Sequence, residues 1–123
     1  MRAIIFVGIG GGLGSILRYL AQVFIGRHIP IVFPIGTFLV NVSGCFLIGM
    51  FYAFAGKYTG FSPDWRLFLI TGVCGGYTTF STFSYDGLYL LRQGANLSFM
   101  FYIIGNVVLG LLATFAGAAL LKL

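Results

Sequence analysis

The residues best suited to chemistry in this chain are gathered in one short stretch, residues 75–84 (GGYTTFSTFS). Two glycines, five Ser or Thr hydroxyls and two phenylalanines stand there within an otherwise apolar run. A helix in lipid must satisfy its own backbone, and breaks persist only where protein or a water-filled cavity covers them. A polar, breakable segment inside a membrane span therefore indicates a pathway for an ion or solute rather than a simple anchor.

The glycine pair weakens a helix, so we expect a break near residues 75–79. Main-chain carbonyls freed at mid-membrane are good ligands for a hard cation. The alternative is that the hydroxyls bond back to their own helix and only bend it. Phe80 and Phe83 are three apart and project from similar faces. They either pack, as phenylalanine ordinarily does, or turn their positive ring edges towards an anion.

Polar residues in the other apolar stretches leave two readings open. Asn41 either hydrogen-bonds to another helix as structural glue or offers its N–H groups to an anion in a pore. Arg18 either snorkels to the membrane surface or lines an aqueous vestibule that attracts anions. The last stretch carries one stripe at successive i+4 steps, expected to face a pore or partner rather than lipid: Tyr102, Asn106, Gly110 and Thr114.

The composition predicts the elements that must position these residues. Of 123 residues, 59% are hydrophobic and 7% are charged, whereas a soluble domain carries roughly 25% charged residues. Mean hydropathy is +1.04. Four stretches reach the about 20 residues that cross a bilayer core, at residues 3–25, 33–55, 67–91 and 97–121. We expect one all-α transmembrane domain over residues 1–123, with four helices of which the third is broken.

The short connections between these stretches leave no room for a soluble catalytic or nucleic-acid-binding domain. The one histidine, His28, is expected in a loop without a partner, so we expect no enzyme. Glycines in the first stretch recur at four-residue spacing in two sets, Gly8 with Gly12 and Gly10 with Gly14. That spacing favours close packing of helices.

The basic residues barely choose an orientation in the membrane. With four spans, one side collects Arg2, Lys57, Arg66 and Lys122, and the other collects Arg18, Arg27 and Arg92. Four against three is a weak bias for the positive-inside rule. It permits either a single orientation or insertion both ways, which would allow a closed antiparallel two-fold dimer. The net charge of +5 lies mainly at loop positions beside lipid headgroups and does not favour a nucleic-acid partner.

Three segments together resemble the small bacterial fluoride channels of the CrcB/Fluc family: residues 14–19 (GSILRY), 36–41 (GTFLVN) and 71–84 (TGVCGGYTTFSTFS). The resemblance covers essentially the whole chain, and its third segment is long and chemically unusual. It implies an antiparallel, dual-topology homodimer with two fluoride pathways, exporting fluoride passively across the bacterial inner membrane to relieve fluoride toxicity. Pairing with a paralogue in place of a second identical copy stays open.

The resemblance also implies roles for individual residues. Asn41, Phe80 and Phe83 match the pore lining of the family, and Arg18 matches the arginine near the pore entrance. A central sodium ion, structural and not transported, would be held by the main-chain carbonyls of Gly75 and Thr78. Ser81, Thr82 and Thr114 resemble members of a polar track that continues the path. Gly110 stands where a serine can occur, which leaves the full set of pore hydroxyls open.

Two other functions compete with a fluoride channel. A small four-helix exporter of cationic drugs would need a membrane-embedded carboxylate, and only Asp86, towards the end of the third stretch, could serve. A purely structural membrane subunit would explain the packing glycines but not the polar centre. A fluoride pore needs convergent donors weak enough to release the ion. Neutral Asn, Ser and Thr side chains with phenylalanine edges suit that need.

Overall fold

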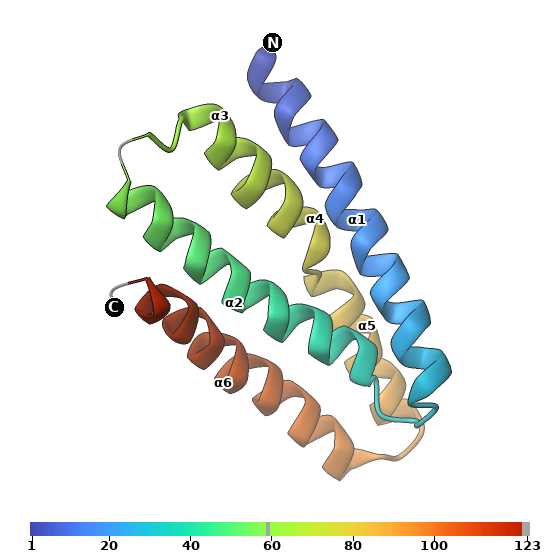
Figure 1. Cartoon of the computed structure of the whole chain (residues 1–123). Coiled ribbons are helices and arrows are strands. Elements are labelled where there is room, and N and C mark those ends of the chain that lie inside the picture. Colours follow the sequence, from blue (N-terminus) through green and yellow to red (C-terminus); the bar gives the residue numbers. More distant parts are fainter. Residues whose placement is uncertain (59, 122–123) are drawn as a thin grey trace.

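The computed structural model describes residues 1–58 and 60–121, so Lys122, counted above among the basic residues, lies outside them. The described residues form helices joined by turns, with no strand among them. Three long helices run side by side with the divided third stretch (Figure 1). They are α1 (Arg2–His28), α2 (Ile35–Lys57) and α6 (Asn96–Leu120). His28 is therefore the last residue of a helix, so the expectation that it lies in a loop was wrong.

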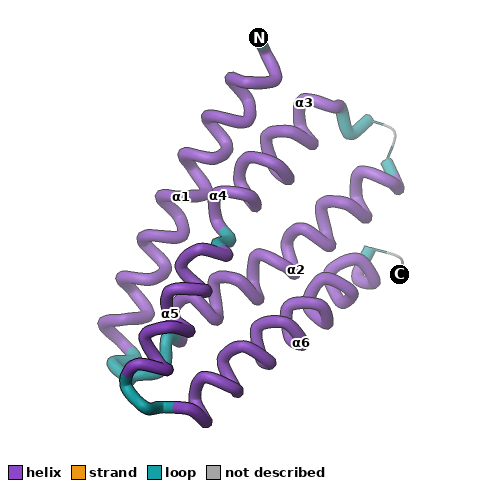
Figure 2. Tube along the Cα trace, turned by 180° about the vertical axis from the view of Figure 1, so that it is seen from behind, coloured by secondary structure: helices purple, strands orange, loops and turns teal. Residues whose placement is uncertain are grey.

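The short helix α3 (Pro63–Arg66) leads into the third apolar stretch. That stretch is divided into the π-helix η1 (Leu67–Cys74), α4 (Gly75–Tyr77) and α5 (Phe80–Arg92). Between α4 and α5 the backbone is extended, with φ −84° and ψ 157° at Thr78 and φ −149° and ψ 126° at Thr79. Figure 2 shows this interruption as a non-helical segment between α4 and α5. The helix therefore stops after Tyr77 and restarts at Phe80, with Thr78 and Thr79 extended between the two parts.

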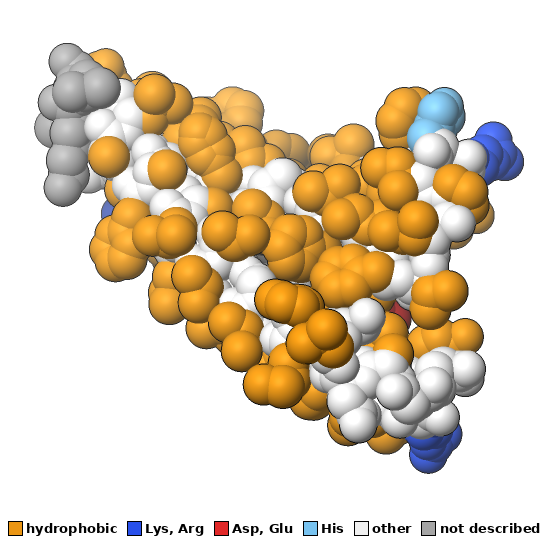
Figure 3. Space-filling view, turned by 90° about the horizontal axis from the view of Figure 1, so that it is seen from below, with side chains coloured by type: hydrophobic (Ala, Val, Ile, Leu, Met, Phe, Trp, Pro, Cys, Tyr) orange, Lys and Arg blue, Asp and Glu red, His pale blue; other side chains and the backbone are white. Residues whose placement is uncertain are grey.

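The exterior of the molecule suits hydrocarbon. Among the described residues, three helices (α1, α2 and α6) are long and apolar enough to cross a membrane, and the divided third stretch is not one of them. Large apolar side chains lie outside: Phe24, Phe101 and Phe115 are 62%, 64% and 69% exposed. Apolar side chains cover most of the face in Figure 3, with basic ones at its periphery. An apolar exterior of this extent marks a surface that meets lipid or another protein.

Helix α1 packs against η1 and α4 at close range. A Cβ at Gly14 would lie 2.9 Å from the Tyr77 nitrogen and closer still to the Val73 carbonyl oxygen. Gly10 is equally confined by the backbone of η1. One of the two glycine sets therefore makes the expected close contact. The expectation was wrong for the other set within this chain, because a Cβ at Gly8 or Gly12 meets no atom within 4 Å among the described residues.

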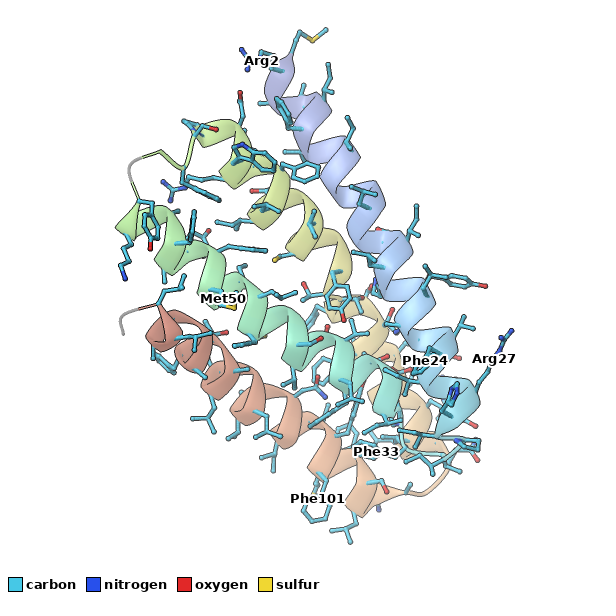
Figure 4. The ribbon with its side chains drawn as sticks, in the orientation of Figure 1. Arg2, Phe24, Arg27, Phe33, Met50 and Phe101 are labelled. Atoms are coloured by element: carbon cyan, nitrogen blue, oxygen red, sulfur yellow. The ribbon has the colours of Figure 1, made fainter. Side chains whose placement is uncertain are left out.

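The start of α1 and the end of α6 lie towards the same end of the molecule (Figure 1). At that end an Arg2 guanidinium nitrogen lies 2.6 Å from Asp64 Oδ2, and Lys57 Nζ donates to the Leu121 carbonyl at 2.8 Å. Arg2 and Arg27 mark the opposite ends of α1 (Figure 4). The Arg2–Asp64 pair is largely exposed and contributes little stability. Packing of α2 against α6 makes the most extensive helix contact, with α5 beside α6.

Substituting Gly14 tests the close approach of α1 to the third stretch. We expect Gly14→Ala to lower the free energy of unfolding by about 1–3 kcal/mol, because the new methyl meets backbone atoms that cannot rotate away. Gly12→Ala on the same helix is the matched control and should change stability by less than about 0.5 kcal/mol, since its site is open. Equilibrium unfolding in detergent measures both, and equal effects would contradict the packing described.

Candidate functional site

The backbone at the interruption is satisfied by an asparagine side chain. The Thr79 N–H donates to Asn41 Oδ1 at 2.9 Å, and Asn41 Nδ2 donates to the Thr79 carbonyl at 3.0 Å. One side-chain amide of α2 thus replaces both ladder bonds that Thr79 would make inside a helix. Asn41 Nδ2 also lies 3.5 Å from Asn106 Oδ1, at the outer limit of hydrogen bonding. The observed contacts of Asn41 are therefore those of a residue that joins helices by hydrogen bonds. Its weaker N–H contact is directed to Asn106 on α6.

The hydroxyls at the interruption divide between two uses. Thr79 is the N-cap of α5, its Oγ1 accepting from the Thr82 N–H at 3.1 Å and lying 3.3 Å from Ser81 Oγ. Thr78 Oγ1 instead donates back to the Cys74 carbonyl at 3.0 Å. The back-bonding expected as an alternative therefore occurs at Thr78. At Thr79 the hydroxyl starts the next helix, which is the usual use of a Ser or Thr N-cap.

Arg18 reaches the same region from α1. Its Nε donates to the Gly76 carbonyl at 3.1 Å, and the side chain is half-buried. The guanidinium is therefore turned inwards to the third stretch. Neither of the two hypotheses drawn from the sequence included this contact. Thr114 lies apart from this group, with its Oγ1 donating to the Gly110 carbonyl on its own helix at 3.1 Å.

An open groove of about 330 Å³ runs beside the interruption. It brings together four of the predicted site residues, Asn41, Thr78, Phe80 and Phe83, and Asn106 from the polar stripe of the last stretch. The whole lining is neutral and consists of Asn41, Gly44, Cys45, Ile48, Thr78, Thr79, Phe80, Phe83, Asn106 and Val107. Ser81, Thr82 and Thr114 do not line it.

The two phenylalanine rings lie next to each other, with centroids 5.6 Å apart and planes tilted by 54°. Phe83 also contacts Tyr102, at 5.2 Å between centroids. Phe80 is 78% exposed, whereas Phe83 is half-buried. The Phe83 ring thus packs against Tyr102 on α6, and the Phe80 ring is open to the outside of the single chain.

Sequence reasoning missed a buried polar pair beside the groove. Tyr102 is fully buried, and its hydroxyl donates to Asp86 Oδ2 at 3.0 Å. On the facing helix Thr37 is 5% exposed and accepts from Gln22 Nε2 at 3.2 Å. The sequence did contain signals for this pair, because Asp86 is a lone acid in an apolar stretch and Tyr102 begins the polar stripe. That stripe does face inwards, with Tyr102 and Gly110 buried.

Carboxylate, thiol or imidazole ligands do not gather anywhere in residues 1–58 and 60–121 in a group of three or more that could hold a metal ion. Main-chain carbonyl oxygens are another class of ligand for a hard cation. The donors that would occupy the Gly75 and Thr78 carbonyls in a continuous helix are diverted: the Thr79 N–H goes to Asn41 and the Thr82 N–H goes to Thr79 Oγ1. Two carbonyls released in this way fit the preference of a hard cation for oxygen.

Comparison with known proteins identifies the family. The model described as CrcB-like protein, Camphor Resistance (CrcB), matches residues 5–118. A protein of Flavobacterium psychrophilum is 45% identical, and one of Rhizobium meliloti is 50% identical, each over 99% of this chain and 98% of the relative. A protein of Phocaeicola vulgatus is 49% identical over 95% of this chain and 96% of the relative. All three are named fluoride-specific ion channel FluC.

These relatives are ion channels and not enzymes, in agreement with the expectation that this chain is no enzyme. They also agree with the apolar helices in describing a multi-pass membrane protein. With a family model over most of its length and relatives at 45–50% identity, the chain belongs to the CrcB-like family.

Proposed function

We propose that this protein is a fluoride-selective ion channel that lets fluoride leave the cell passively across the bacterial inner membrane and so relieves fluoride toxicity. The observation that carries the proposal is the neutral groove at the interruption, which unites Asn41, Phe80 and Phe83. The names of the relatives support fluoride as the ion.

The lining offers donors without a full charge. Fluoride is small and strongly hydrated, so a pathway must replace its water and still release it. The Asn41 N–H that only weakly reaches Asn106 at 3.5 Å can turn to an anion with little loss. The positive edges of Phe80 and Phe83 supply further weak contacts. We assign Ser81, Thr82 and Thr114 to the polar track beyond the groove, and Arg18 to its entrance.

A cation exporter is disfavoured by the environment of the one acid in the apolar stretches. Asp86 accepts the Tyr102 hydroxyl at 3.0 Å, so it is already engaged within the protein. A purely structural subunit does not explain a neutral groove built around an interrupted helix.

Fluoride efflux from liposomes tests the ion and the role of the rings. We expect passive fluoride flux without a proton gradient and with chloride largely excluded. Phe80→Ile and Phe83→Ile should each lower fluoride flux by about five- to tenfold, because an aromatic contact is worth roughly 1 kcal/mol and isoleucine keeps bulk without a positive edge. Phe101→Ile is the matched control, since Phe101 is exposed on α6 away from the groove.

Two results would count against the channel proposal: chloride flux equal to fluoride flux, or flux that needs a proton gradient. Normal flux in both Phe80→Ile and Phe83→Ile would leave the channel in place and make the rings packing residues only.

We further propose that two copies assemble as an antiparallel homodimer of dual topology. Phe80 is 78% exposed, and an exposed polar pair joins Ser43 Oγ to the Tyr77 hydroxyl at 2.9 Å beside the interruption. Polar groups at membrane depth are tolerated where protein covers them. A second copy would cover this face, and the four-to-three distribution of basic residues permits both orientations.

Labelling of a single cysteine tests dual topology. In a background carrying Cys45→Ala and Cys74→Ala, Gln93→Cys places one exposed thiol in the turn before α6. An impermeant reagent applied to intact cells should label about half of the protein, and the rest should react only after permeabilisation. The control is a membrane protein of known single orientation that carries one cysteine at its terminus, and this cysteine should react from one side only. Labelling entirely from one side would exclude dual topology.

We propose a structural sodium ion between the two copies, held by the Gly75 and Thr78 carbonyls of each. Two copies would supply four oxygens, which suits a hard cation. The diverted Thr79 and Thr82 N–H groups support the availability of these carbonyls. When bound, the ion would fix the two interruptions against each other without being transported.

Thermal unfolding in sodium against N-methylglucamine at equal ionic strength tests this ion. We expect sodium to raise the midpoint in the unmodified protein and in Thr78→Ser, because main-chain atoms bind the ion. Gly75→Leu should abolish the response. Among the described residues, the nearest atom that a Cβ at Gly75 meets outside its own helix turn is Ile70 O, at 3.9 Å. Gly75→Ala is therefore the control for a change that the single chain accommodates, and it should unfold at a midpoint close to that of the unmodified protein in N-methylglucamine. Equal midpoints in the two salts would refute the proposal.

A further inference from the structure

Arg18 and Gly14 are four residues apart on one face of α1, and both touch the third stretch. Gly14 lets α1 approach the backbone of Val73 and Tyr77. One turn further along, Arg18 Nε donates to the Gly76 carbonyl at 3.1 Å, a contact between residues 58 apart in sequence. The glycine contact therefore brings the guanidinium within reach of the residue that precedes the end of α4.

The Gly76 carbonyl needs a donor from elsewhere. In a continuous helix it would accept from the N–H of Phe80, four residues on. The extended backbone of Thr78 and Thr79 separates α4 from α5, so the last carbonyls of α4 must find other partners. A guanidinium donor makes a charge-assisted bond, which is stronger than a neutral one.

The Arg18–Gly76 bond lies next to the carbonyls that we assign to sodium, so it can affect their direction as well as the stability of the fold. Gly76 lies between Gly75 and Thr78 in sequence, the two residues whose carbonyls we assign to sodium. A fixed Gly76 carbonyl restricts the peptide planes on both sides of it. On the far side of the interruption, Asn41 holds Thr79 in a similar way through two hydrogen bonds.

We propose that Arg18 is a positioning residue, whose guanidinium holds the Gly76 carbonyl and thereby fixes the direction of the neighbouring carbonyls for a cation. The cation part of this proposal rests on the proposed function, whereas the clamp on the backbone does not. A role in attracting anions depends on charge alone. The clamp depends on the planar donor geometry of arginine, which lysine does not reproduce.

Hydrogen–deuterium exchange of the full-length protein in lipid nanodiscs tests the clamp. The variants are Arg18→Lys and Arg18→Ala, with Arg27→Lys and Arg27→Ala as controls, because Arg27 is exposed near the end of the same helix. We expect both Arg18 variants to speed amide exchange in residues 75–82 by about tenfold. Exchange within α6 should stay unchanged, and the sodium concentration for half-maximal protection of residues 75–82 should rise. The Arg27 variants should match the unmodified protein.

Several outcomes separate this proposal from its rivals. Unchanged exchange in Arg18→Lys, with reduced fluoride flux in Arg18→Ala, would show that Arg18 acts through charge and would overturn the clamp. Faster exchange throughout α6, or failure of both variants to fold, would assign it a general structural role and overturn it as well. If sodium does not slow exchange in the unmodified protein, the sodium proposal fails. The clamp is then still tested by comparing exchange of residues 75–82 in the Arg18 variants and the unmodified protein in N-methylglucamine.

Discussion

Backbone groups released inside an apolar environment must find partners, and this requirement organises the centre of the protein. The interruption at Thr78 and Thr79 removes helical bonds where water is scarce. Three substitutes come from different places: the Asn41 amide from α2, the Thr79 hydroxyl from the interruption itself, and the Arg18 guanidinium from α1. Helices α1 and α2 are therefore joined to the third stretch by polar bonds as well as by packing.

The same residues that satisfy the interruption also border the groove. Asn41 bonds to Thr79 on one side and faces Asn106 on the other. The groove can be neutral because the backbone beside it is satisfied by an amide and a hydroxyl, so no ion pair has to be buried there. A buried charge would be costly to desolvate and would hold an oppositely charged ion too firmly for conduction.

The sequence predicts the long helices well, because membrane-crossing length and apolar content are local properties. Helices α1, α2 and α6 agree with the predicted spans within three residues at each end. The π-helix Leu67–Cys74 escaped prediction. The roles of Asn41 and Arg18 stayed open because their partners lie 38 and 58 residues away. The sequence also could not show that Gly10 and Gly14 make close contacts whereas Gly8 and Gly12 do not. The two pairs have the same spacing, and only the packing of the third stretch against α1 distinguishes their faces.

The two kinds of groove residue differ in what a substitution can reveal. Asn41 supports the backbone and lines the groove, so its replacement would change the interruption and the groove together. The Phe80 ring lies beside the Phe83 ring, and 78% of the Phe80 surface is open in the single chain. A change of ring to aliphatic side chain there leaves the hydrogen bonds of Thr79 in place. In the proposed channel, a substitution at Phe80 or Phe83 therefore tests conduction with the backbone of the interruption left intact, whereas a substitution at Asn41 changes both.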